Sequence, residues 1–397
     1  MRGRRLIGCA VLAMFLAGAS QAQAAVHSRE QLTALMAAGP TALDALTPHG
    51  KRAFLDSLRW GQQGLGGFST APLVRELNAA QIAGVMKLLH SDEYTAMLTR
   101  DLDDSTPLRF AAPSARIASA AKAFRQFNDR VDRRREESAA AGVTRGPIEL
   151  VRYYHAHFSP YMRPDQRKAH PPADLLLLFD VASAVVATAG DPQALLHLRA
   201  IFAEFERRGI DTRRTLDDAM LRALLAGRRF GDARVFAAAH PRQGRQAIAR
   251  EIDTLSPAFR GRSVYRFDAA ANTLERIAVP PAQGIQVVMV VDAGCHFSEA
   301  ALQAVGSDAD LFARLSRAGL LVITPPRSPV PTRFMAEWNE KYPQLALRAP
   351  FNAEQWRDID VTGVPAFFIL ENGRVRTRID GWPGPDQKAV LLDALGR

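Results

Sequence analysis

The stretch that decides the fold runs from residue 285 to residue 298 and reads IQVVMVVDAGCHFS. Its first part, from Ile285 to Val291, is a valine-rich apolar run broken only by Gln286, which is typical of a strand buried on both faces of a sheet. A short loop leads to Cys295, and the residues from Glu299 to Ala318 follow a helical pattern. The sequence therefore predicts a thiol at the start of a helix that follows a central strand.

The position of Cys295 favours a reactive sulfur. The first turn of a helix presents free N–H groups and the positive end of the helix dipole, and both stabilise negative charge. The thiolate is the nucleophilic form of cysteine, so we expect Cys295 to react. A protonated His296 would add to this effect, and the Ser298 hydroxyl, one turn further on, could donate to the sulfur. The plainer interpretations stay open: Cys295 as a small buried apolar residue, His296 as an exposed turn residue and Ser298 as an ordinary first-turn residue.

The elements around this motif alternate as in an α/β fold. Before it, Ser263–Phe267 and Thr273–Val279 alternate in polarity around a turn and predict a β-hairpin. After it, the sequence predicts a strand at 320–324, a helix at 332–342, a short extended piece at 345–348, a helix starting at Asn352, strands at 366–370 and 374–379 joined by Asn372-Gly373, and a helix at 386–395.

Cys-x-x-Ser at a helix start, followed by TGVPAFF at residues 362–368 and this order of elements, resembles the thioredoxin superfamily. The fold class expected is therefore an irregular α-helical N-terminal domain followed by a thioredoxin-like domain at 258–397, with a central mixed β-sheet flanked by helices. The resemblance implies that Pro365 follows a cis bond and faces the sulfur. It also implies that Phe297, Gly363 and Val364 contact a substrate peptide.

Two departures from the family pattern restrict the chemistry. Ser298 stands where dithiol members carry the second cysteine, so this domain is expected to act as a monothiol. Met289 stands where thioredoxins hold a buried acid. The function predicted is thiol-disulfide exchange through mixed disulfides, as an isomerase, a reductase or a thiol-dependent chaperone.

Other functions remain as alternatives. The first is a non-catalytic interaction module on a degenerate thioredoxin fold. An iron–sulfur carrier resembling monothiol glutaredoxins ranks lower, because His296 is bulky where those proteins have glycine. A peroxidase ranks lowest, because Asp292 stands where a threonine is expected.

The N-terminus has the features of a secretory signal peptide at residues 1–24. Three arginines in the first five residues precede the apolar stretch Leu6–Ala17, and Ala22-Gln23-Ala24 is a small-x-small cleavage pattern. We therefore predict a periplasmic or secreted protein. Cleavage removes Cys9 and leaves Cys295 as the only thiol, so the expected partners are cysteine-containing exported proteins or a second copy of the chain in a homodimer.

Residues 25–257 are predicted to be helical throughout, with a possible division into two subsections near 142–172. Gly64–Gly67 is interpreted as a break between helices. One apolar stripe is predicted on a helix after Pro113, formed by Ile117, Ala121, Phe124 and Val131. Leu175–Ala189 is expected to be a buried helix, too short for a stable membrane span.

Composition disfavours several other classes. The formal net charge is +10, but the basic residues are scattered among acids, which predicts a solvated surface and no nucleic-acid binding. His155, His157 and His170 have no metal-ligand spacing on a helix, so no metal site is expected. No glycine loop for phosphates and no other cofactor motif is present in the sequence, and we expect no cofactor.

Overall fold

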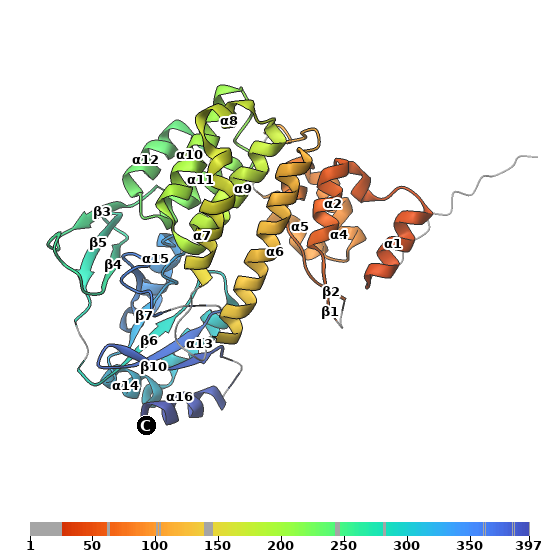
Figure 1. The fold of residues 1–397 in the computed structure, drawn as a ribbon. Helices are drawn as coiled ribbons and strands as arrows, with labels where there is room; N and C mark the ends of the chain where they lie inside the picture. The colour runs from red at the N-terminus through yellow and green to blue at the C-terminus, as the bar shows by residue number, and fades with distance from the viewer. Residues whose placement is uncertain are drawn as a thin grey trace, which may run out of the picture. The chain divides into compact units, whose positions relative to one another are not determined.

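The computed structural model describes residues 26–61, 64–100, 102, 105–138, 146–242, 247–280, 283–359, 361, 363–382, 384 and 386–396. The predicted signal peptide therefore lies outside the described residues. Backbone contacts divide the chain into two compact units, Met1–Leu102 and Asp103–Arg397, and each is described by itself (Figure 1).

The first unit is a small helical domain. Its α-helices are α1 (Arg29–Ala38), α2 (Pro48–Ser57), α3 (Ala71–Glu76), α4 (Ala79–Leu88) and α5 (Thr95–Thr99). Two hydrogen bonds stabilise the start of α2. The Thr47 side chain caps the helix by accepting from Gly50 N, and the Glu76 side chain accepts from Thr47 N. The apolar faces of these helices meet in a core that contains Phe54 and Ile82.

The prediction of helix throughout 25–257 is wrong at one place in this unit. Strands β1 (Arg59–Gly61) and β2 (Gly64–Gly67) form an antiparallel hairpin, with Trp60 paired to Leu65. The backbone at Gly64 has φ +111°, a conformation open to glycine because it has no Cβ. The glycines interpreted as a helix break are therefore part of a strand pair.

The second unit begins with a helical bundle. Its helices are α6 (Ala115–Ser138), α7 (Gly146–Phe158), α8 (Pro164–Ala169), α9 (Pro172–Ala189), α10 (Pro192–Arg207), α11 (Leu216–Ala226) and α12 (Phe230–Ala239). The predicted stripe on α6 is confirmed: all four of its residues are buried, and three of them pack in the bundle core with α7 and α9, namely Ile117, Ala121 and Phe124.

Helix α9 is long and apolar enough to cross a membrane by length and composition, with a mean hydropathy of 1.6. Half of it is buried inside the protein, where Leu175, Leu178 and Phe179 contribute to the bundle core. Its packing is that of a core helix, as the sequence predicts for Leu175–Ala189, but the helix begins at Pro172 and is three residues longer than the stretch expected to be too short for a membrane span.

The remainder of the second unit is built on an eight-stranded mixed sheet with the order β10-β9-β6-β7-β8-β4-β5-β3. The strands are β3 (Arg250–Asp253), β4 (Ser263–Asp268), β5 (Thr273–Ala278), β6 (Ile285–Val290), β7 (Leu321–Ile323), β8 (Leu347–Pro350), β9 (Ala366–Glu371) and β10 (Arg374–Asp380). Strand β6 is parallel to β7 and antiparallel to β9, which is antiparallel to β10.

The connections around β6 alternate helices and strands. Helices α13 (His296–Ser307) and α14 (Ala309–Arg317) join β6 to β7, α15 (Thr332–Lys341) follows β7, and α16 (Asp386–Gly396) follows the β9–β10 hairpin. Side chains of β6 alternate between two cores: Val287 and Met289 on one face, Val288 and Val290 on the other. This two-sided burial explains the uninterrupted valine-rich run.

Two expectations for this part are corrected. Residues 353–358 form turns and not the predicted helix after Asn352. Asn352 Oδ1 does accept from Gln355 N, but Trp356 is buried in the core and its Nε1 donates to Ser263 O, which holds the chain in turns. The sheet also begins at Arg250 in β3, before the domain start predicted at 258.

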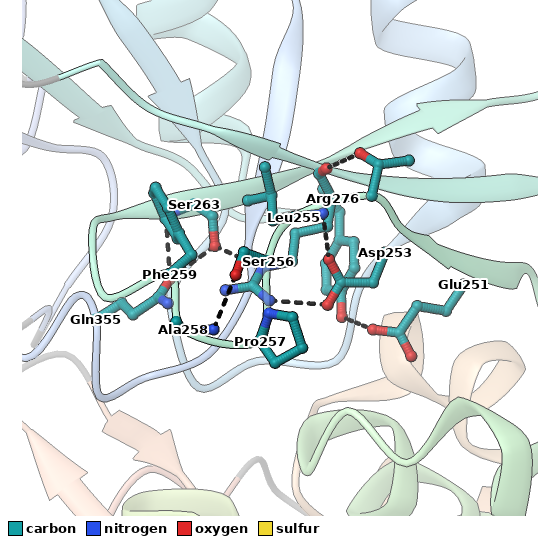
Figure 2. Close-up of polar contacts among 12 residues, drawn as sticks. Glu251, Asp253, Leu255, Ser256, Pro257, Ala258, Phe259, Ser263, Arg276 and Gln355 are labelled. Carbon is teal, nitrogen blue, oxygen red and sulfur yellow. Dashed lines mark hydrogen bonds and ion pairs between the residues drawn. The ribbon is translucent and has the colours of Figure 1, made fainter.

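Strand β3 is attached to the sheet by a polar cluster that Figure 2 shows in close-up. Arg276 is buried, donates to Ser263 Oγ at 2.9 Å and to Asp253 Oδ2 at 2.8 Å, and lies 3.5 Å from the centroid of the Phe351 ring. Nearby, the Tyr265 hydroxyl donates to Glu251, and burial raises the pKa of Tyr265. These polar contacts hold β3 beside β5, although β3 lacks the alternation of apolar residues that is typical of the other strands.

Candidate functional site

The register between β6 and β9 brings the two predicted motifs together. Val290, the last residue of β6, pairs with Ala366, the first residue of β9. The loop 291–295 leaves β6 at the same edge where the loop before Pro365 enters β9. Segments far apart in the sequence thus meet at one end of the sheet.

Cys295 is the N-cap residue of α13, with extended backbone at φ −92° and ψ 107°. Its N–H donates to Asp292 O at 3.4 Å, and its carbonyl accepts from Glu299 N at 3.1 Å. The residue is half-buried, and its Sγ donates to Val364 O at 3.6 Å. The sulfur therefore lies at the positive end of a twelve-residue helix and against the proline-led strand.

The segment facing the sulfur has the geometry that the resemblance implies. The Val364–Pro365 bond is cis, Pro365 is buried, and Pro365 O accepts from Gly381 N at 2.8 Å. Val364 is half-buried and packs on the core that contains Trp356. Gly363 is exposed, and a Cβ built on it would meet nothing within 4 Å. This side of the site is thus open next to Gly363.

Ser298 has a different environment from the one expected. Its side chain is fully buried, and its hydroxyl accepts from Asp292 N at 3.3 Å. This bond fixes the loop between β6 and α13. Met289, at the position of the family's acid, is fully buried among apolar residues.

The two residues between Cys295 and Ser298 face solvent. Phe297 is 51% exposed, one of the few large apolar side chains on the described surface. The His296 ring is also exposed, and its centroid lies 3.8 Å from that of Phe297. Together they form an apolar and aromatic surface beside the sulfur.

Asp292 is a residue of this site that the sequence reasoning used only to disfavour a peroxidase. Burial raises the pKa of its carboxyl group, and the hydrogen bond that Ala293 N donates to Oδ1 at 2.9 Å partly offsets the effect. The signal for it was an acid placed directly after a buried apolar strand, three residues before the thiol.

The histidines considered for a metal are dispersed among other contacts. His155 Nε2 lies 3.2 Å from Asp191 Oδ2, the His157 ring packs on Tyr153, and His170 neighbours Asp174. Within the described ranges, no group of three His, Cys, Asp or Glu side chains could hold a metal ion.

No protein-family model and no curated relative matches the chain. Among solved structures, it is similar to a thioredoxin-like protein in its oxidised form, at 14% identity over 29% of this chain and 79% of that one, with a TM-score of 0.24. It is also similar to a thioredoxin-like protein from Bacteroides caccae, at 12% identity over 61% of this chain and 86% of that one, with a TM-score of 0.23.

A third similar structure is the C-terminal domain of an uncharacterized protein from Bacteroides fragilis, at 11% identity over 38% of this chain and 96% of that one, with a TM-score of 0.23. Scores this low do not establish a family.

Proposed function

We propose that this protein is exported and carries out thiol-disulfide exchange through Cys295, forming mixed disulfides with cysteine-containing exported proteins. The observation that carries the proposal is the position of the sulfur. Cys295 is a half-buried residue at the N-cap position of α13, and its Sγ lies 3.6 Å from the carbonyl oxygen of Val364, the residue before the cis proline.

The chemical step begins with the Cys295 thiolate. It attacks one sulfur of a client disulfide, a new S–S bond forms, and the other client sulfur leaves as a thiolate. No electrons are gained or lost overall. Ser298 has no sulfur to displace the client, so the mixed disulfide persists until a second client thiolate or an external thiol attacks it.

The surroundings of the sulfur support binding of an extended client segment. Phe297, two residues after Cys295, offers an exposed aromatic surface, and a Cβ built on Gly363 would meet nothing within 4 Å. Val364 provides a carbonyl acceptor next to the sulfur. A client cysteine at the sulfur would thus have an apolar surface and a backbone acceptor near it.

The test is to trap the mixed disulfide. Protein lacking residues 1–24 is mixed with a peptide that contains one disulfide, quenched in acid and analysed by intact mass. We expect an adduct of one peptide chain that disappears on reduction. Cys295→Ser abolishes the adduct, whereas the matched control Ser298→Ala keeps it, because the thiol and its helix remain.

A second candidate is a non-catalytic interaction module, favoured by the buried Ser298 and by Met289 at the acid position. Pull-downs from the periplasm separate the two. Partners captured equally by wild type and Cys295→Ser, and not released by reductant, would favour the interaction module and contradict exchange chemistry.

A further inference from the structure

A cavity of about 370 Å³ lies within the second unit, between the helical bundle and the sheet. Helices α9 and α11 form one side, with Ser183, Ala187, Ala219 and Arg222 among the lining residues. The other side is the loop 325–329 that follows β7, together with Ile359 and Val361. The volume is within the range of small-molecule sites.

The sequence of the two helices explains why this space is not filled. The lining positions of α9 and α11 carry alanine, serine and threonine together with one arginine, in helices whose other faces bury leucine and phenylalanine. Protein interiors are otherwise packed almost without voids, so small residues repeated at one face of two adjacent helices leave room for a ligand.

The loop side of the cavity is held in place. Arg228, in the connection between α11 and α12, donates to Ser328 O at 2.8 Å and to Pro326 O at 3.4 Å. The same guanidinium donates to Pro350 O and Phe351 O, which anchors it to the end of β8. The wall is therefore formed before any ligand binds, which lowers the cost of binding.

Among the described lining residues, the charged side chains are both arginines. Arg222 on α11 is exposed and Arg327 lies in the loop, and no described lining residue is acidic. Asp360, between two lining residues, is outside the described residues. An arginine guanidinium recognises carboxylate and sulfonate oxygens through paired N–H donors, while the alanines and prolines around it suit an apolar body.

We propose that this cavity binds a small organic anion, a carboxylate or sulfonate with a compact apolar body. Its wall includes Val361, three residues before Val364, so the two lie at most about 11 Å apart along the chain. Cys295 is not among the lining residues, and the inference does not depend on exchange chemistry.

The test uses two probes with the same aromatic body, anilinonaphthalene sulfonate and the uncharged phenylnaphthylamine, with fluorescence titration of the full mature chain. Arg222→Glu should weaken sulfonate binding about tenfold and leave the uncharged probe within twofold. The matched control is Arg317→Glu, an exposed arginine on α14 outside the cavity, which should change neither.

A second variant tests the location. Ala187 is exposed at the cavity lining, so Ala187→Trp fits a folded protein while filling the space, and it should weaken both probes at least fivefold. Sulfonate binding that falls equally in Arg222→Glu and Arg317→Glu, or that is unchanged in Ala187→Trp, overturns the proposal. Cys295→Ser should bind both probes normally, whatever its effect on mixed disulfides.

Discussion

Arg228 offers the sharpest test of how the helical bundle and the sheet are joined. Its guanidinium donates to five carbonyl oxygens: Ser328 O at 2.8 Å, those of Leu225, Pro350 and Phe351 at 3.3 Å, and Pro326 O at 3.4 Å. Burial lowers the pKa of Arg228 from 12.5 to about 10. That drop corresponds to about 3 kcal/mol of desolvation cost for the charged form.

The hydrogen bonds must offset this cost. A hydrogen bond to a charged group contributes about 1.5–3 kcal/mol, and here only the bond to Ser328 O has a short distance, the other four being longer and weaker. Arg228→Met removes all five bonds and leaves the carbonyls without their donor. We expect a loss of about 3 kcal/mol in the free energy of unfolding, which lowers Tm by about 5 °C for a unit of the size of Asp103–Arg397.

The assay is thermal unfolding of the full mature chain combined with hydrogen exchange. The amides of Arg327 and Ser328, and those around β8, should exchange faster in Arg228→Met, because the loop loses its anchor. Arg229→Met is the matched control, since that neighbouring arginine is exposed and pairs with Asp232, and it should cost less than about 1 kcal/mol. Equal Tm values for the two variants would refute the reasoning.

Three further predictions concern the site and the bundle. Ser298→Cys places a second thiol one turn from Cys295, and its attack on the mixed disulfide should shorten the lifetime of a peptide adduct at least about tenfold in an intact-mass time course. An adduct as long-lived as that of wild type would argue against this intramolecular attack. Asp292→Asn removes a carboxylate near the thiol and should raise the rate of iodoacetamide labelling at pH 7 about twofold, because a nearby negative charge disfavours the thiolate; an unchanged rate would exclude this influence. Two arginines hold the pKa of Glu204 at about 2, below its ordinary 4.5, so the stability that the ionised carboxylate adds to the folded state is fully present above pH 4.5 and is lost as pH falls toward 2. The urea midpoint of Glu204→Gln should therefore fall less steeply than that of wild type between pH 4.5 and pH 2. An equally steep fall in both proteins would contradict the role given to Glu204.

The parts of the fold that sequence patterns could predict are those with local markers. Asp191 caps α10 and Pro192 occupies its first position, as the turn Gly190-Asp191-Pro192 predicts. The β4–β5 hairpin and strand β6 followed from alternation and from a continuous apolar run. In each case the residues that mark the element lie within it or next to it, so no knowledge of distant contacts is needed.

The elements that were missed depend on pairing partners. Strand β3 lies parallel to β5 and reads REID, a polar segment without strand periodicity, and Arg276 on the neighbouring strand β5 stabilises it through Asp253. Strands β1 and β2 are short and rich in glycine, and their pairing replaced the helix break expected there. The predicted helix after Asn352 failed because burial of Trp356 outweighs a local capping signal.

The same distinction explains why one site could be anticipated and the other could not. The loop of Cys295 and the loop of Pro365 each contain unusual residues directly beside a strand. The pairing of Val290 with Ala366 then brings the two loops together. Arg228 and the cavity beside it have no such mark, because the acceptors of Arg228 are backbone carbonyls, which every residue provides. A side-chain pattern can predict a site made of side chains, whereas a junction made of backbone acceptors and small residues becomes visible only once the chain is folded.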